Sequence, residues 1–278
     1  MLKLIIQITK LIVFLVLALL VSSCKITVED GRDGENGKSS NSWFSNEKGS
    51  GNISTQTRKI EGDFNKIEVS NAIVVTYTQS DTKSIKVTTD EELLDKIVTE
   101  INNGVLEIYL KNSINATKME VTVSNPSLNA IETSSAADFK ATNEINTESL
   151  SLESSSASKI KLTTNAAEFI TESSSASSQN ILLNGNKNTK VTVETSSAST
   201  VNIEGVAGTG NYDSSSASSI KAGGLQLQKA ITNSTSGSNI KVYAIEELKA
   251  NASSGSSTKM TNKPKELIVD SSSGASIN

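Results

Sequence analysis

A short serine-rich motif, Ser-Ser-Ala or Ser-Ser-Gly, recurs eight times in the C-terminal half of this 278-residue chain. Thr235 replaces the first serine in one copy. The last residue of the motif falls at Ala136, Ala157, Ala176, Ala198, Ala217, Gly237, Gly255 and Gly274, so the spacing is 18 to 22 residues. A unit of about 20 residues cannot bury its apolar face alone, so neighbouring units must stack and share one core.

Apolar residues alternate with polar residues on both sides of the motif. Leu150 and Leu152 precede one copy, and Ile160 and Leu162 follow it. A period of two is typical of strands with one buried face. The copies lack the leucine-rich repeat frame, and propeller blades need about 40 residues. We therefore predict an all-β parallel β-helix, a solenoid with coils of about 20 residues. A serine-rich disordered tail is the alternative, which the regular flanks disfavour.

In such a solenoid the serine motifs form corners that line up along the axis. Stacking places identical residues above one another, and small side chains suit a tight corner that recurs in every coil. We expect the Ser-Ala pairs to pack inward. Stacked hydroxyls can then donate to one neighbour and accept from another.

The stretch from Lys59 to Ser127 lacks the motif but is rich in alternating apolar residues. We expect an irregular cap here, because an open solenoid end exposes unpaired strand edges. Asn103 and Gly104 separate two apolar runs and predict a hairpin, since Asn-Gly accepts the positive φ of a tight turn. From Asp90 to Lys96 we expect one helical turn with Asp90 as its N-cap.

The N-terminus has the form of a secretory signal. Lys3 and Lys10 precede an apolar run from Leu11 to Val21. This run is shorter than the roughly 20 residues that a membrane-spanning helix needs. The segment Val21-Ser22-Ser23-Cys24 resembles the lipobox of bacterial lipoproteins. The resemblance implies that residues 1–23 are a signal peptide and that Cys24 is acylated, for example with palmitate. An ordinary signal peptide with a chance cysteine is the alternative.

Residues 24–57 are rich in Gly, Ser, Asn and charged side chains and predict a flexible tether. Asp30, Asp33 and Glu35 lack the spacing of a calcium loop, and we expect them to be solvated. Trp43 and Phe44 are expected to pack on the folded domain, which we place at residues 58–278.

Composition excludes several classes of function. The absence of His removes His-based triads, His zinc sites and imidazole as a base near neutral pH. The single Cys excludes an intrachain disulfide. Without residues 1–23, 24 basic and 30 acidic groups give a net charge near −6, which disfavours nucleic-acid binding. We expect no catalytic residue, no cofactor and no metal site.

One part of the sequence resembles a known family. The resemblance rests on Gly62, Asp63, Phe64, Ile67, Val69, Ile73, Val75, Tyr77, Gln79, Asp81, Ile85, Val87, Asn103, Gly104, Leu106 and Ile108. This pattern is similar to the auto-transporter adhesin head GIN domain, and the similarity extends from about Lys59 to the C-terminus. It implies a right-handed, single-stranded parallel β-helix on a secreted or envelope lipoprotein, and it offers no catalytic residues to carry over.

Glutamates precede several of the serine motifs. Glu132, Glu153, Glu172 and Glu194 stand one or two residues before the serine run, so stacking aligns them in a column. Like charges about 4.8 Å apart repel, so a solvated outward ladder is the plain interpretation. A row that binds cations or polysaccharide is the alternative. We expect Asp213 and Asp270 to be isolated.

These observations predict a lipid-anchored lipoprotein of the cell envelope with a non-catalytic binding or adhesion role, and the family resemblance implies that it lies in the outer membrane. Its expected partners are the lipid bilayer, through Cys24, and a surface glycan or envelope protein. The side of the membrane that it faces stays open. A structural envelope rod is one alternative. A polysaccharide-degrading enzyme is less supported, because coils of 18 to 22 residues leave little length for catalytic loops. A flat hydroxyl array like that of ice-binding solenoids ranks below adhesion.

Overall fold

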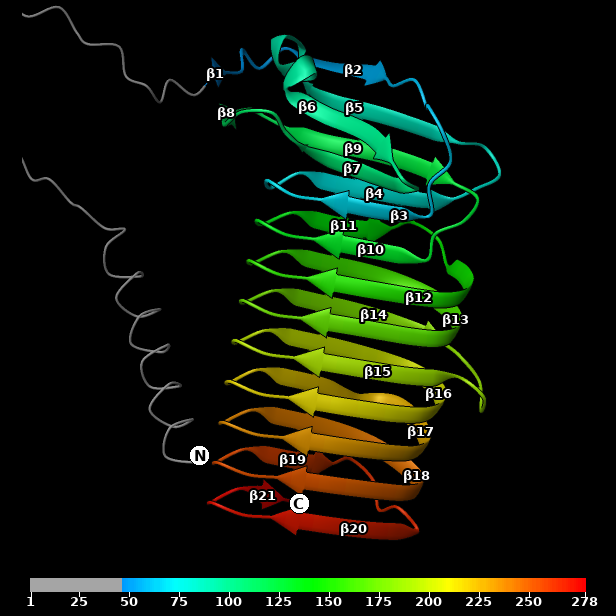
Figure 1. Ribbon diagram of the computed structural model, residues 1–278, viewed down its shortest axis with the longest axis vertical. Helices are drawn as coiled ribbons and strands as arrows, with labels where there is room; N and C mark the ends of the chain where they lie inside the picture. Colours follow the sequence, from blue (N-terminus) through cyan, green and yellow to red (C-terminus); the bar gives the residue numbers. More distant parts are fainter. Residues whose placement is uncertain (1–46) are drawn as a thin grey trace, which may run out of the picture. The chain divides into compact units, whose positions relative to one another are not determined.

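The computed structural model describes residues 47–278. The predictions on residues 1–23, Cys24, Trp43 and Phe44 lie outside the described residues. The described chain is a stack of strands with a more irregular layer at one end, where β2 and β5 lie (Figure 1). No helix in the described part of the chain has the length and apolar character needed to cross a membrane.

The regular part is a parallel β-solenoid of about seven turns with coils of about 20 residues, as predicted. The strands that lead into a serine corner are β10 (Ala130–Thr133), β12 (Ile145–Ser154), β15 (Lys190–Thr195) and β20 (Glu266–Ser271). Those that leave a corner are β11 (Asp138–Ala141), β14 (Ser178–Asn184), β19 (Ser257–Met260) and β21 (Ser276–Ile277). Four long strands leave one corner, bend and reach the next: β13 (Lys159–Ser173), β16 (Thr200–Ser214), β17 (Ser219–Ser234) and β18 (Asn239–Ala252).

The serine motifs line up because successive coils pair in parallel and in register. Leu152 pairs with Thr171, and Thr171 pairs with Val193 in the next coil. Inward positions on these strands are buried and outward positions are mostly exposed, which is the alternation that the sequence shows. Phe139, Phe169 and other large inward side chains fill the core.

Each serine corner is a tight turn whose two central residues have positive φ. At Ser135 and Ala136 the φ values are 50° and 62°, and the N–H of Ala137 donates to the carbonyl of Ser134 at 3.0 Å. These values belong to a type I′ turn. The corners also bond to one another, because the N–H of Ala136 donates to the carbonyl of Ser156 in the next coil at 2.9 Å. The corner is therefore a continuation of the hydrogen-bonded ladder.

The expectation that the Ser-Ala pairs pack inward was wrong. Ser156 and Ala157 are exposed, because both central residues of the turn project from the edge of the coil. The buried hydroxyls belong to the residues on either side of the turn, Ser154 and Ser158. The strand alternation turns these two side chains inward.

The first corner does not contain the serine motif. It lies between β3 (Lys66–Val69) and β4 (Val74–Gln79), with Asn71 and Ala72 at φ 62° and 57°. Both strands stack on the coil formed by β10 and β11. The roughly 50 residues between β4 and β10 build the cap, in which Val105–Leu110 pairs in parallel with β3 and Met119–Asn125 with β4, before the chain continues at the next coil.

The cap contains antiparallel pairs, as expected for an irregular end. β2 (Ile53–Thr57) pairs with β5 (Ser84–Asp90), and β5 pairs with β9 (Met119–Asn125). β6 (Ile97–Asn102) and β7 (Val105–Leu110) form the predicted hairpin. Its turn residues, Asn103 and Gly104, have φ of 50° and 82°. This confirms that the Asn-Gly pair adopts the positive φ that the tight turn requires.

Two details of the cap differ from expectation. Residues 47–57, which we expected in the tether, contain β1 (Glu47–Lys48), paired with β8 (Ile114–Asn115), and β2. This polar segment is held by strand pairing and not by a buried apolar face. Its sequence therefore lacks the apolar alternation that would have predicted strands.

The helical turn is a 3-10 helix, η1 (Glu91–Lys96), and Asp90 makes no capping hydrogen bond to it. Asp90 is instead buried and accepts hydrogen bonds from the N–H of Gly51 at 2.6 Å and of Thr117 at 2.7 Å. Burial alone would raise the pKa of Asp90, but these bonds outweigh burial and lower it. Asp90 therefore ties the segment before β2 to the segment before β9.

Candidate functional site

Carboxylates form a continuous column along the outer surface of the strands that lead into the corners. The register pairs Glu132 with Glu153, Glu153 with Glu172 and Glu172 with Glu194. The predicted glutamate column is thus present. Paired residues on neighbouring parallel strands lie about 4.8 Å apart, so the column repeats one chemical group at the spacing of the coils.

The column is longer than the sequence indicated. Glu107 pairs with Glu68, and Glu68 pairs with Glu132, so it begins in the cap. At the other end Glu194 pairs with Asp213, and the column continues through Asn233, Asn251 and Asp270. The expectation that Asp213 and Asp270 are isolated was wrong. Each stands four residues before the Ala or Gly of a corner, as do Glu68 and Glu132, and this constant offset is the signal that finds them.

A shallow groove of about 260 Å³ follows the middle of the column. It is lined by Glu153, Glu172, Glu194, Asp213 and Asn233 together with hydroxyl side chains such as Ser174, Ser196 and Ser215. The hydroxyls come from the first residue of each corner. The groove is therefore a strip in which an acidic or amide side chain and a hydroxyl recur in every coil.

Charge within the column is only partly compensated. Lys66 pairs with Glu68 at 2.6 Å and with Glu132 at 2.9 Å, at the end nearest the cap. Further along, partial burial raises the pKa of Glu153, and the charges of Glu132 and Glu172 raise it further. The middle of the column thus holds carboxylates that repel one another.

The column does not form a discrete metal centre. Among residues 47–278, no group of three or more acidic or cysteine side chains converges in a way that could hold a metal ion. The carboxylates spread along the strip, with one in each coil except the two that carry Asn233 and Asn251. Such an arrangement suits an extended partner with its own repeat better than a single ion.

Behind the strip, the buried hydroxyls bond across the coils. Ser177 Oγ donates to the carbonyl of Ser154 at 2.9 Å and lies 2.8 Å from Ser173 Oγ. Gln179 Nε2 donates to Ser154 Oγ at 2.8 Å. Because these polar groups satisfy one another, the corner is rigid and fixes the exposed strip.

Comparison with known proteins agrees with this architecture. The family described as "Putative auto-transporter adhesin, head GIN domain" matches residues 63–264. The chain belongs to the head GIN family. No curated protein matches the sequence.

Solved structures share the head GIN fold. A "putative lipid binding protein" from Parabacteroides distasonis ATCC 8503 is 22% identical with a TM-score of 0.75, and the match covers 83% of this chain and 98% of that one. A "putative adhesin" from Parabacteroides merdae ATCC 43184 is 21% identical with a TM-score of 0.76, covering 83% and 97%. A second "putative adhesin" from P. distasonis is 21% identical with a TM-score of 0.75, covering 84% and 100%. At this identity the likeness shows the fold alone.

Proposed function

We propose that this head GIN protein is a lipid-anchored protein of the cell envelope with a non-catalytic binding or adhesion role. The family and two of the structural relatives carry adhesin names, and none of these names is that of an enzyme. The observation that supports the proposal most directly is the strip of recurring carboxylates and hydroxyls. A regular solenoid presents an extended surface to a partner, and here an acidic or amide side chain and a hydroxyl repeat on it in each coil.

The strip favours a partner that also repeats, such as a surface polysaccharide. Hydroxyl groups of a polysaccharide can donate to the carboxylates and accept from the serines of the strip. Contacts that are individually weak add up when several coils engage one chain, because later contacts form at high effective concentration. Adhesion through such a surface needs no single deep pocket.

The test compares two triple variants with the same change in charge. Glu153→Gln, Glu172→Gln and Glu194→Gln neutralise three carboxylates that line the groove. Glu148→Gln, Glu168→Gln and Glu204→Gln neutralise three exposed carboxylates outside the column. Purified protein that starts after Cys24 is applied to a printed panel of bacterial and host polysaccharides.

We expect the native protein and the second triple variant to bind the same glycans, and the first triple variant to lose at least tenfold in affinity. Equal binding by all three proteins would show that the carboxylates of the strip do not contribute to glycan binding. Failure of the native protein to bind any glycan or intact cell would favour a structural envelope rod. Turnover of a polysaccharide would contradict the non-catalytic role.

Lipid anchoring is the second half of the proposal, and it depends on Cys24. A Cys24→Ser variant should stay unprocessed and take up no labelled palmitate, and globomycin should block maturation of the native chain. Proteolysis of intact cells then distinguishes a surface-exposed solenoid from a periplasmic one. Globomycin-resistant processing to a soluble product would contradict acylation and indicate an ordinary signal peptide.

A further inference from the structure

A second cavity lies where the cap meets the first coil, away from the acidic column. Its volume is about 430 Å³, within the range of roughly 300–1,000 Å³ that is typical of small-molecule sites. It is lined by Asp63, Phe64, Asn65, Lys83, Gly104, Asn125, Pro126 and Ser127. These residues come from the loop before β3, the residue just before β5, the β6–β7 hairpin, and the end of β9 with the loop that follows it. The cavity therefore exists only in the folded cap.

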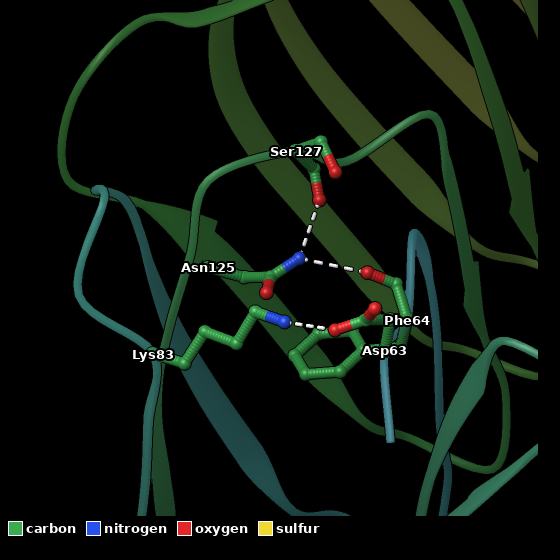
Figure 2. A network of polar contacts seen from close by, with 5 residues as sticks. All are labelled: Asp63, Phe64, Lys83, Asn125 and Ser127. Atoms are coloured by element: carbon green, nitrogen blue, oxygen red, sulfur yellow. Dashed lines mark hydrogen bonds and ion pairs between the residues drawn. The ribbon is translucent and has the colours of Figure 1, made fainter.

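Asn125 presents an unused hydrogen-bond acceptor at this cavity. Its side chain is only 1% exposed, and Nδ2 donates to the carbonyls of Phe64 at 2.8 Å and Ser127 at 2.6 Å (Figure 2). Two carbonyl acceptors use both amide hydrogens and so fix which side of the amide is oxygen. Oδ1 has no donor among residues 47–278. A buried acceptor without a donor is costly, so a group that supplies one is favoured here.

Two opposite charges stand beside this amide. The ammonium of Lys83 donates to the carboxylate of Asp63, and Figure 2 shows the lysine side chain passing on the side of Asn125 that carries the oxygen. The Asp63 side chain is 91% exposed and that of Lys83 is 34% exposed. An ion pair this exposed contributes little to stability, so its two groups can exchange partners at small cost.

We propose that this cavity binds a neutral saccharide. One hydroxyl group can donate to Asn125 Oδ1 while its oxygen accepts from the Lys83 ammonium. A neighbouring hydroxyl can donate to the Asp63 carboxylate. The charges of Asp63 and Lys83 cancel, so the cavity favours neither an anionic nor a cationic ligand by net charge, whereas adjacent neutral hydroxyls satisfy all three groups.

This site is independent of the acidic strip, so the two can be tested separately. Methyl glycosides of glucose, galactose, mannose and N-acetylglucosamine are titrated into the ¹⁵N-labelled protein that starts after Cys24. We expect at least one glycoside to shift the side-chain amide resonances of Asn125 in a saturable way. The strip variant with three glutamines should respond equally, because its substitutions lie in the other groove.

Two surface variants test the ion pair, and a third supplies the control. Lys83→Met should weaken binding of that glycoside at least tenfold, whereas Lys86→Met, at an exposed lysine three residues further along in β5, should bind like the native protein. Asp63→Asn should also weaken binding. Neither Lys83 nor Asp63 is buried in the core, so these variants are expected to fold, and unfolding curves check this.

Three results would overturn the proposal. One is that no glycoside shifts the Asn125 amide at concentrations up to tens of millimolar. Another is that Lys83→Met and Asp63→Asn bind as tightly as the native protein. The third is a crystal soaked in the glycoside that shows only a water molecule, or Lys83 itself, donating to Oδ1. Any of these would leave the acidic strip and the proposed adhesion role unaffected.

Discussion

The hydroxyl of Tyr77 donates a hydrogen bond of 2.9 Å to the carbonyl oxygen of Asn125. Tyr77 belongs to β4 in the first coil, and Asn125 ends β9 in the cap. The ring of Tyr77 also stacks on Phe139 in the next coil, with 6.0 Å between centroids. One buried side chain thus joins the cap, the first coil and the second coil at the edge of the proposed saccharide cavity.

Tyr77→Phe should destabilise the protein by about 1 kcal/mol at neutral pH, because it removes this hydrogen bond while the N–H of Ser80 still bonds to the same carbonyl. Burial raises the pKa of Tyr77 to about 12. Its folded pKa is above the unfolded value near 10, so this contribution is complete below about pH 10 and is lost as the pH rises toward 12. Urea unfolding at pH 8, 10 and 11.5 measures both effects. The variant should lose less stability than the native protein above pH 10; parallel pH curves would contradict this account.

The corners make a second prediction, because most of them place an alanine at positive φ. Ala157 has φ of 62°, whereas Gly237 occupies the same place in a later corner at 70°. The left-handed region costs a non-glycine residue roughly 1–2 kcal/mol, which exceeds the roughly 0.5–1 kcal/mol of extra entropy that glycine loses on folding. Ala157→Gly should therefore stabilise the protein by about 0.5–1 kcal/mol in chemical denaturation.

Two controls isolate the backbone effect in the corners. Gly237→Ala should cost a similar amount, since a Cβ there meets no atom within 4 Å. Ala137→Gly changes a buried residue just after a corner and should destabilise the protein. If Ala157→Gly and Ala137→Gly had the same sign, positive φ would not be the cause.

The corners also show how far the sequence could predict this fold. Eight of them have a local signature, because the turn demands small residues and each copy follows the last by one coil. The corner at Asn71 and Ala72 has no such signature, since the cap is inserted before the chain returns to the next coil at Ala130. The side chain of Ser154 is buried and that of Ser156 is exposed. This difference can be derived from the sequence only once the turn is known to have two central residues.

The two candidate sites also differ in how far the sequence could predict them. The acidic column follows from a constant offset within each repeat and was partly predicted. The saccharide cavity brings together Asp63, Lys83 and Asn125 from three separated segments. The family resemblance rests in part on Asp63, Phe64 and Gly104, but only the folded cap shows that these residues line a cavity with an unpaired amide oxygen.

The buried hydroxyl network should make single serines important. Ser177→Ala removes the bonds to Ser173 Oγ and to the Ser154 carbonyl, and we expect a loss of about 1–3 kcal/mol. Ser175→Ala, at an exposed position in the same corner, should change stability by less than about 0.5 kcal/mol. Thermal unfolding of the two variants distinguishes them. Similar Tm values would mean that the inward hydroxyls are not a stabilising network.

Tyr212 is the opposite case, because its buried hydroxyl has no partner among residues 47–278. Burial raises the pKa of this phenol above its ordinary value, so it stays protonated. Tyr212→Phe keeps the ring and removes an unsatisfied polar atom, and we expect stability to rise by about 1 kcal/mol. Denaturant unfolding at pH 7 measures the change. A loss of stability would indicate that a buried water bonds to the hydroxyl, which a high-resolution crystal structure would reveal.

Repulsion within the acidic column gives a prediction that depends on pH. Partial burial and the charges of Glu132 and Glu172 raise the pKa of Glu153. A carboxyl whose folded pKa is raised favours folding while it is protonated and loses this contribution as the pH rises through that pKa.

Glu153→Gln should therefore raise stability at pH 7 by a few tenths of a kcal/mol, the size expected for an exposed column. It should have no effect near pH 3.5, where the native side chain is also neutral. Glu148→Gln, outside the column, serves as the control in the same Tm measurements. Salt should shrink the gain at pH 7, because it screens exposed charges. A stabilisation that is equal at both pH values and insensitive to salt would assign the effect to packing and leave the column without measurable repulsion.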